Sequence, residues 1–319
     1  MFWPTSASSP TTPFANAESC NRSSAASPDR TFGNTQQGGA RSISVASSDG
    51  LTVDQKISLP RVPSDEDIHQ MNWQMRPMAE TWRGGRASLR WLIGAPIVNA
   101  NVALRAKDKQ HARALIAAHF ARFLDTCRVS VTLDGPLPES GRGCILCYNE
   151  TSFIDVAAFG VSMWPHVDRA AAADIYAYLP FGRSAARKAA IEMVPRGNRL
   201  ATERLLKRMV AAVRRGERLA WGGEGRLYGR DGIGRFKVGA SLIAIRAQAP
   251  LIPVVFHGGH HALPLGSIRA RSGRIRVRFG TPIPTTGLKE EEARGLADHV
   301  QEEVARIYAV LKEACREDA

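Results

Sequence analysis

Short apolar runs alternate with longer stretches of helical periodicity along the chain beyond Asp125. Compact runs rich in Val, Ile, Leu and Phe predict strands. The expected strand ranges are 129–133, 143–147, 190–194, 218–221, 251–256 and 274–279. The periodic stretches predict helices over 110–125, directly after Asp155, and over 201–214, 239–247 and 290–312. Strands joined by crossover helices pair in parallel, so the predicted fold is α/β, with a largely parallel central sheet flanked by helices.

A helical segment over residues 75–125 is expected before the sheet. Its longest apolar stretch, from Trp91 to Val98, is interrupted by Pro96 and is too short to span a bilayer. Trp82 and Trp91 stand beside several arginines, as in helices that lie in a membrane interface. A helix that packs on the core explains the same pattern, and the sequence leaves both alternatives open.

The first 65 residues are rich in Ser, Thr, Ala and Pro and carry few large apolar side chains. Such a composition buries too little surface to offset chain entropy, which predicts disorder. The start of the chain lacks the basic and apolar regions of a secretory signal peptide. The expected organisation is therefore a disordered segment over 1–65, a helical segment over 75–125 and a main domain over 126–315.

The chain carries 43 Lys and Arg against 30 Asp and Glu, a formal net charge of +13. Anionic partners are expected, and an anionic phospholipid surface is one of them. No helix-turn-helix, zinc-finger or aromatic RNA-binding signature is present, so a nucleic-acid partner is not expected. Cys144 and Cys147 form a C-x-x-C within an apolar run without a second pair, which favours buried strand residues over a metal site.

The first motif follows the strand predicted over 143–147, and it reads Asn149-Glu-Thr-Ser-Phe-Ile-Asp155. Polar residues at a strand-to-helix junction are often only a helix N-cap, so this block alone decides little. Further blocks follow in order. They are Leu179-Pro-Phe-Gly182 with Ile191-Glu-Met-Val-Pro-Arg196, then Trp221-Gly-Gly-Glu-Gly-Arg226 with Gly234-Arg-Phe-Lys-Val-Gly-Ala240, then Ala249-Pro-Leu-Ile-Pro-Val254, and finally Gly280-Thr-Pro-Ile283.

This series resembles the glycerol-3-phosphate and lysophosphatidic acid (1-acylglycerol-phosphate) acyltransferase family. The family's first block is Asn-His-x-Ser-x-x-Asp, so Asn149, Ser152 and Asp155 match while Glu150 replaces the catalytic histidine. Lys237 and Pro253 match supporting positions of the third and fourth blocks. The resemblance covers residues 145 to 283, and the order of its blocks carries more weight than any single motif.

The resemblance implies transfer of a fatty acyl group from acyl-CoA or an acyl carrier protein to a lysophospholipid acceptor in phospholipid synthesis, at the cytoplasmic face of the membrane. No cofactor and no metal are implied. The implied catalytic pair is Glu150 as base with Asp155 as its orienting partner. The implied acceptor and phosphate site consists of Arg196, Gly223, Glu224, Gly225 and Arg226, although Arg226 stands where the family has threonine.

Three hypotheses remain open for Glu150. An ordinary glutamate is a weak base at neutral pH, but burial and nearby negative charge raise the pKa of a carboxyl group, so Glu150 could serve as the base. Alternatively, one of His257, His260 and His261 replaces the missing histidine in space. The third alternative is a catalytically impaired, lipid-binding or regulatory member of the same fold.

Overall fold

The computed structural model describes residues 78–138 and 142–317, so the segment predicted over 1–65 lies outside the described residues. Within this part of the chain one sheet is formed by β1 Val129–Asp134, β2 Cys144–Tyr148, β3 Arg169–Ala173, β4 Ile191–Val194, β5 Arg218–Gly222, β6 Leu251–His257 and β7 Gly273–Phe279. The strand order is β1-β7-β6-β2-β5-β3-β4. All neighbours pair in parallel except β6 and β7, which confirms the largely parallel α/β fold.

Six of these strands lie where the apolar runs predict them, and β3 is the one that the sequence pattern missed. Its residues are one arginine followed by four alanines, which lack the branched and aromatic side chains typical of strands. The strand forms because its backbone pairs with β4 on one side and β5 on the other. Pairing with the two neighbouring strands, and not local sequence preference, therefore makes this segment a strand.

The helices are α2 Met78–Arg105, α3 Lys109–Cys127, α4 Phe153–Ser162, α5 Gly182–Ala189, α6 Arg199–Arg214, α7 Gly239–Ala247, α8 Gly259–Ala262 and α9 Ala293–Glu317. Short 3-10 turns are η1 Trp164–His166, η2 Asp174–Tyr178 and η3 Glu290–Glu292. Side-chain caps fix two helix starts: Asp108 accepts a hydrogen bond from the N–H of His111 at α3, and Asn198 accepts one from Ala201 at α6.

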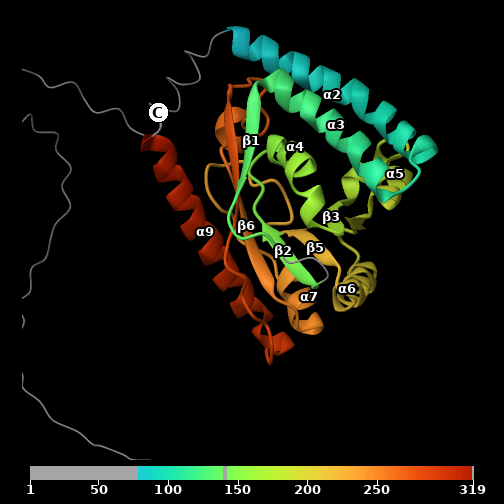
Figure 1. Ribbon diagram of the computed structural model, residues 1–319, viewed down its shortest axis with the longest axis vertical. Helices are drawn as coiled ribbons and strands as arrows, with labels where there is room; N and C mark the ends of the chain where they lie inside the picture. The colour runs from blue at the N-terminus through green and yellow to red at the C-terminus, as the bar shows by residue number, and fades with distance from the viewer. Residues whose placement is uncertain (1–77, 139–141, 318–319) are drawn as a thin grey trace, which may run out of the picture. The chain divides into compact units, whose positions relative to one another are not determined.

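Alternating side chains of the sheet pack into two separate cores, as β2 shows. Leu146 and Tyr148 point toward the layer that contains α3 and α4, whereas Ile145 and Cys147 point toward α6, α7 and α9. Figure 1 shows α9 on one side of the sheet and α2, α3 and α4 on the other. Cys144 and Cys147 are buried free thiols within β2. Helices thus cover both faces, which leaves the strand ends as the place for polar loops.

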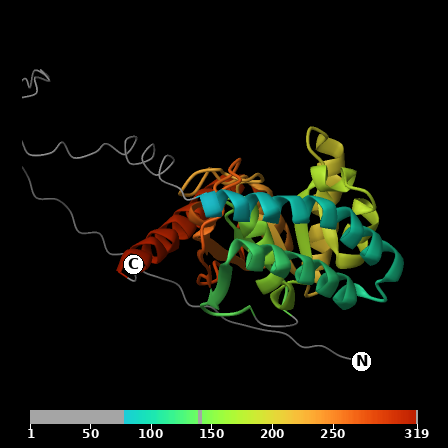
Figure 2. The same cartoon turned by 90° about the horizontal axis from the view of Figure 1, so that it is seen from above.

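Helix α2 packs on the rest of the domain along one face and exposes apolar side chains on the other. It lies beside α3 along its length (Figures 1 and 2) and buries Ala87 and Val102. Its outer face exposes large apolar side chains, among them Trp82 at 72%, Leu92 at 60% and Ile97 at 57%. None of the helices within 78–138 and 142–317 has the length and apolarity needed to cross a membrane.

Candidate active site

The first motif and the third meet at one edge of the sheet. Because β2 and β5 are parallel neighbours, the loops that follow them leave the sheet side by side. The N–H of Gly223 donates to the carbonyl of Tyr148 over 2.7 Å, which joins the two loops at their starts. Strand β6 is the other neighbour of β2, so the loop after His257 reaches the same edge.

Asn149 fixes the first motif to β6. Its side chain is fully buried, donates to the carbonyl of Phe256 over 3.0 Å and accepts from the N–H of Phe256 over 2.9 Å. Both the nitrogen and the oxygen of the Asn149 side-chain amide are therefore hydrogen-bonded to the backbone of Phe256. This pairing sets where the next residue, Glu150, leaves the sheet.

Glu150 lies between the two loops, and its side chain is partly buried. Its backbone N–H donates to Oε2 of Glu224 over 2.9 Å, and its carbonyl accepts from the N–H of Tyr228 over 2.8 Å. Its carboxylate packs beside Gly222, where a larger residue would crowd it. Burial, followed by the negative charges of Glu224 and Asp155, raises the pKa of Glu150 to about 8.

Asp155 stabilises the turn that carries Glu150 and makes no direct hydrogen bond with its carboxylate. Oδ2 of Asp155 accepts from the N–H and the hydroxyl of Thr151, over 2.8 and 2.7 Å, and from the N–H of Ser152 over 3.0 Å. Oδ1 is buried without a hydrogen-bond partner. Burial raises the pKa of Asp155 to about 6, against the opposing effect of these hydrogen bonds.

Glu224 is the third carboxyl group of the site. It is 4% exposed, and its oxygens accept from the N–H groups of Glu150 and Gly234 over 2.9 and 3.1 Å. Burial raises the pKa of Glu224 to about 7. Glu224 thus holds two loops together and at the same time adds negative charge beside Glu150.

The three carboxyl groups form one coupled acidic cluster. The charges of Glu224 and Asp155 disfavour ionisation of Glu150, and the charge of Asp155 disfavours ionisation of Glu224, so protons leave the cluster in steps that belong to the group as a whole. Glu150 has the highest pKa of the three, close to physiological pH. A carboxylate with this pKa can accept a proton from a hydroxyl group far more readily than an ordinary glutamate.

Basic side chains gather where the third motif reaches solvent. The guanidinium of Arg196 donates to the carbonyl of Gly225 over 3.1 Å, so the structure brings the second and third motifs together. Gly225 has a φ of +65°, and the Lys237 side chain lies against it. Arg226 is exposed at the same turn. An anionic group bound here would lie beside the acidic cluster rather than within it.

Other residues of the motifs have structural tasks. The hydroxyl of Ser152 donates to the carbonyl of Leu263, and Pro253 lies buried in β6 opposite Cys147. Nδ1 of His257 lies 3.6 Å from Sγ of Cys315, and Nε2 of His261 lies 3.5 Å from Oδ2 of Asp231. His257 therefore contacts α9, and His261 contacts the loop after Arg230. These contacts do not favour either histidine as a replacement for the missing base.

Two residues of the site were missed in the sequence. Gly259, the first residue of α8, packs so closely on Oδ1 of Asp155 that a Cβ atom would overlap it. Tyr176 of η2 lies near enough to Glu150 that the glutamate's charge, after burial, helps to raise the pKa of its phenol to about 12. The Gly258-Gly259 pair after a buried strand was a signal for close backbone approach, whereas nothing in the sequence singled out Tyr176.

Comparisons with known proteins agree with this arrangement. Residues 128–257 match the model of the family described as Acyltransferase. The 1-acyl-sn-glycerol-3-phosphate acyltransferase alpha of Ovis aries is 36% identical over 73 residues, which are 23% of this chain and 25% of that protein. The Homo sapiens protein of the same name is 33% identical over 73 residues, 23% of this chain and 26% of that protein. The chain thus matches about a quarter of the length of these relatives.

The fold is also similar to a solved structure. The crystal structure of the 1-acyl-sn-glycerophosphate acyltransferase PlsC from Thermotoga maritima superposes with a TM-score of 0.57. The match covers 73% of this chain and 98% of that one, at 19% sequence identity. At this identity the likeness concerns the fold.

Proposed function

We propose that this chain, whose residues 128–257 match the model of the family described as Acyltransferase, transfers a fatty acyl group from a thioester donor to the free hydroxyl of a lysophospholipid resembling lysophosphatidic acid. The observation that carries the proposal is the Glu150 carboxyl, which occupies the family's histidine position with its pKa raised to about 8. The curated relatives are named for acylation of 1-acyl-sn-glycerol-3-phosphate, which supports a glycerolipid acceptor.

In the proposed reaction Glu150 removes the proton of the acceptor hydroxyl as its oxygen attacks the thioester carbonyl. The new bond joins this oxygen to the acyl carbon, and the carbon–sulfur bond breaks. The departing thiolate takes up the proton that Glu150 received. Asp155 acts on Glu150 through the Thr151–Ser152 turn and through its charge.

Arg196, Lys237 and Arg226 supply the positive charge for the acceptor's phosphate. Arg196 is held beside Gly225 by its hydrogen bond to the glycine carbonyl, and the other two side chains are exposed at the same turn. Arginine suits this task because its planar fork matches phosphate oxygens. An acceptor phosphate at this rim would leave its hydroxyl free to reach Glu150.

We place the reaction at the cytoplasmic surface of a membrane, where such acceptors reside. The outer face of α2 supports this proposal, since Trp82, Leu92 and Ile97 are exposed beside Arg86 and Arg90. Apolar side chains of this kind enter the lipid boundary while arginines meet anionic head groups.

A product-identified assay tests the function. Protein incubated with labelled acyl-CoA and a series of lysophospholipids is expected to form the diacyl product. The Asp155→Ala variant is the control, and equal product from both proteins would contradict the proposal.

If Glu150 is adapted to its task, Glu150→His is expected to lower transfer by at least about 10-fold. A gain in transfer by Glu150→His would instead indicate an impaired enzyme.

The rate of transfer is expected to rise with pH through about 8. The folded-state pKa of Glu150 is raised to about 8, so its proton-accepting form is scarce below this pH and predominates above it. Initial rates measured between pH 6 and pH 9.5, with a donor and an acceptor that do not change ionisation in this range, would show this rise. A rate that is already maximal near pH 6 would contradict the assignment of Glu150 as base.

A further inference from the structure

Residues 227–233, which we call the spacer, join the two halves of the third motif and belong to neither. Their backbone nevertheless holds the first motif. The N–H of Tyr228 donates to the carbonyl of Glu150 over 2.8 Å, and the N–H of Gly229 donates to the carbonyl of Thr151 over 2.9 Å. The position of the proposed base therefore depends on what keeps the spacer in place.

Asp231 joins the spacer to α9. Its Oδ1 accepts from the hydroxyl of Tyr308 over 2.6 Å, and its Oδ2 accepts from Nζ of Lys312 over 2.8 Å. Tyr308 and Lys312 stand one helical turn apart on α9, so both reach the same carboxylate. The Tyr308 side chain is 5% exposed, and its ring packs on His257 with the ring centroids 4.9 Å apart. We call the two contacts of Asp231 with α9 the anchor.

The second half of the third motif has its own contacts with α9. The N–H of Phe236 donates to Oε1 of Gln301 over 2.9 Å, and the carbonyl of Phe236 accepts from the guanidinium of Arg294 over 2.9 Å. Helix α9 itself packs along β6 (Figure 1). Because these contacts do not involve Asp231, loss of the anchor is expected to displace the spacer without unfolding the domain.

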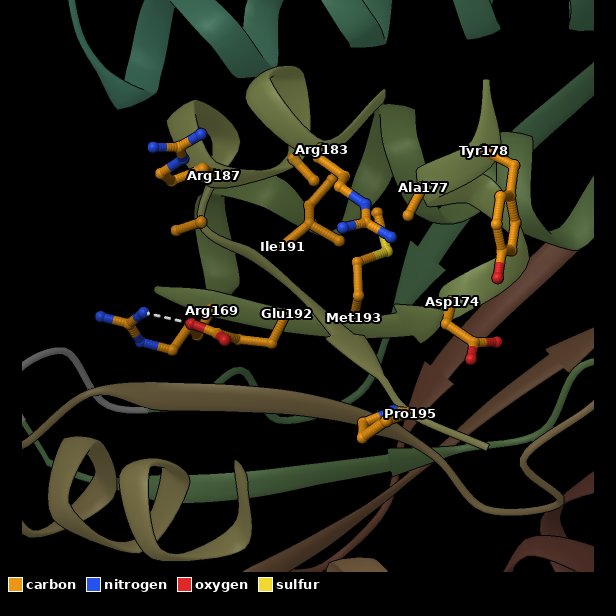
Figure 3. Close-up of a pocket in the computed structure, with 12 residues that line it drawn as sticks. Arg169, Asp174, Ala177, Tyr178, Arg183, Arg187, Ile191, Glu192, Met193 and Pro195 are labelled. Carbon is orange, nitrogen blue, oxygen red and sulfur yellow. Dashed lines mark hydrogen bonds and ion pairs between the residues drawn. The ribbon is translucent and has the colours of Figure 1, made fainter. Parts of the chain in front are cut away.

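The first half of the third motif is held from the opposite direction. Asp174, which lies beyond the end of β3 (Figure 3), accepts from the N–H of Arg196 over 3.1 Å. The guanidinium of Arg196 then donates to the carbonyl of Gly225. These contacts come from the β3–β4 side of the sheet, whereas α9 packs on β6, three strands away from β3 in the sheet order. The anchor is thus the support of the spacer on the α9 side.

Asp231 keeps its charge while the proposed base titrates. Hydrogen bonds from His261, and then from Lys312 and Tyr308, hold the pKa of Asp231 well below its usual range, against the opposing effect of burial. The pKa of Glu150, in contrast, is raised to about 8. The anchor carboxylate therefore stays ionised over the whole range in which Glu150 gains or loses its proton.

We propose that Asp231 is a positioning residue for acyl transfer: by joining the spacer to α9, it fixes the backbone that carries Glu150. The inference rests on the proposed function, because it concerns the base of that reaction. Asp231 itself moves no proton. Glu224 belongs to the same loop as the spacer, so a displaced spacer changes both the burial of Glu150 and its separation from the Glu224 carboxylate.

Asp231→Ala removes the anchor and is expected to lower kcat by about 10- to 100-fold, because a catalytic group displaced by about 1 Å loses up to about 10²-fold in rate. Tyr308→Phe keeps the ring on His257 and removes one donor, so a smaller loss in the same direction is expected. This milder variant carries the test if Asp231→Ala does not fold. The matched control is Glu303→Ala, whose ion pair with Arg306 lies within α9, and its kcat is expected to be unchanged.

The pH dependence of the rate distinguishes positioning from a general loss of stability. Burial and the charges of Glu224 and Asp155 raise the pKa of Glu150, and the phenols of Tyr148 and Tyr176 also face it. None of these groups is altered in the anchor variants. A displaced spacer lessens the burial and the repulsion, so the rise in rate is expected to shift below pH 8. Loss of folded protein alone would lower the rate without shifting its pH dependence.

Hydrogen–deuterium exchange tests the anchor without requiring turnover. The amides of Tyr228 and Gly229 are expected to exchange at least about 10-fold faster in both anchor variants, and at the unmodified rate in Glu303→Ala. This result supports the anchor even if the unmodified protein acylates no lysophospholipid, an outcome that counts against the proposed function alone. Unchanged exchange, or an unshifted pH dependence in active anchor variants, would overturn the role of Asp231 and leave acyl transfer standing.

Discussion

Glu150→Gln is expected to lower kcat/KM for acyl transfer by about 10²–10⁴-fold, the usual contribution of a general base. Glutamine keeps the shape of the side chain beside Gly222 but cannot accept a proton. The backbone contacts of residue 150 with Glu224 and Tyr228 do not involve its side chain, so the fold should persist. Steady-state kinetics with a fixed donor and lysophospholipid acceptor measure the effect.

The control for this substitution is Glu302→Gln, an exposed carboxylate on α9. It makes the same chemical change, carboxyl to amide, outside the motifs and is expected to leave kcat/KM unchanged. Activity of Glu150→Gln within threefold of the unmodified protein would show that another group removes the acceptor proton.

The same carboxyl links activity to stability. The pKa of Glu150 is raised from an ordinary 4.5 to about 8 in the folded protein, so between these values the folded state binds a proton that the unfolded state has released. The unfolding free energy therefore falls as pH rises through this window. The form of Glu150 that can act as base is thus the form that the buried site disfavours. A single carboxyl beside Asp155 and Glu224 combines reactivity with a cost in stability.

The main features of the fold could be predicted because they depend on local apolar patterns. The strands other than β3 and most of the main-domain helices follow from runs such as the one in β6, where every residue is buried. The resemblance to the acyltransferase family could be recognised because the motif blocks keep their order, and residues 128–257 match that family's model. Strand β3 could not be predicted, because four alanines carry no strand preference and only its neighbours specify it.

The sequence suggested members for the site but not the hydrogen bonds that connect them. The sequence pointed to Asp155 as the orienting partner of Glu150, whereas the structure joins Asp155 to the backbone of Thr151 and Ser152. The sequence grouped Glu224 with the acceptor site, and its carboxyl proves to be a buried bridge between two loops. Such details depend on which backbone N–H groups face a carboxylate, and linear spacing does not encode this.

Gly259→Ala is expected to lower the unfolding free energy by about 1–3 kcal/mol and to reduce transfer severely, because it forces extra volume into a filled space. The new Cβ atom would overlap Oδ1 of Asp155. Asp155 cannot move aside cheaply, since its other oxygen is held by three hydrogen bonds to Thr151 and Ser152. Any shift would turn the loop that carries Glu150.

Chemical denaturation and the acyl-transfer assay, applied to the same samples, measure both effects. The matched control is Gly295→Ala on α9, where a Cβ atom meets nothing within 4 Å. An alanine there is expected to stabilise the helix by about 0.5–1 kcal/mol and to leave transfer unchanged. If Gly259→Ala were as stable and as active as Gly295→Ala, the contact between α8 and Asp155 would not be holding the first motif in place. A loss confined to Gly259→Ala would show that the loop after β6 determines the position of the proposed base, although it contributes no proton-transferring group of its own.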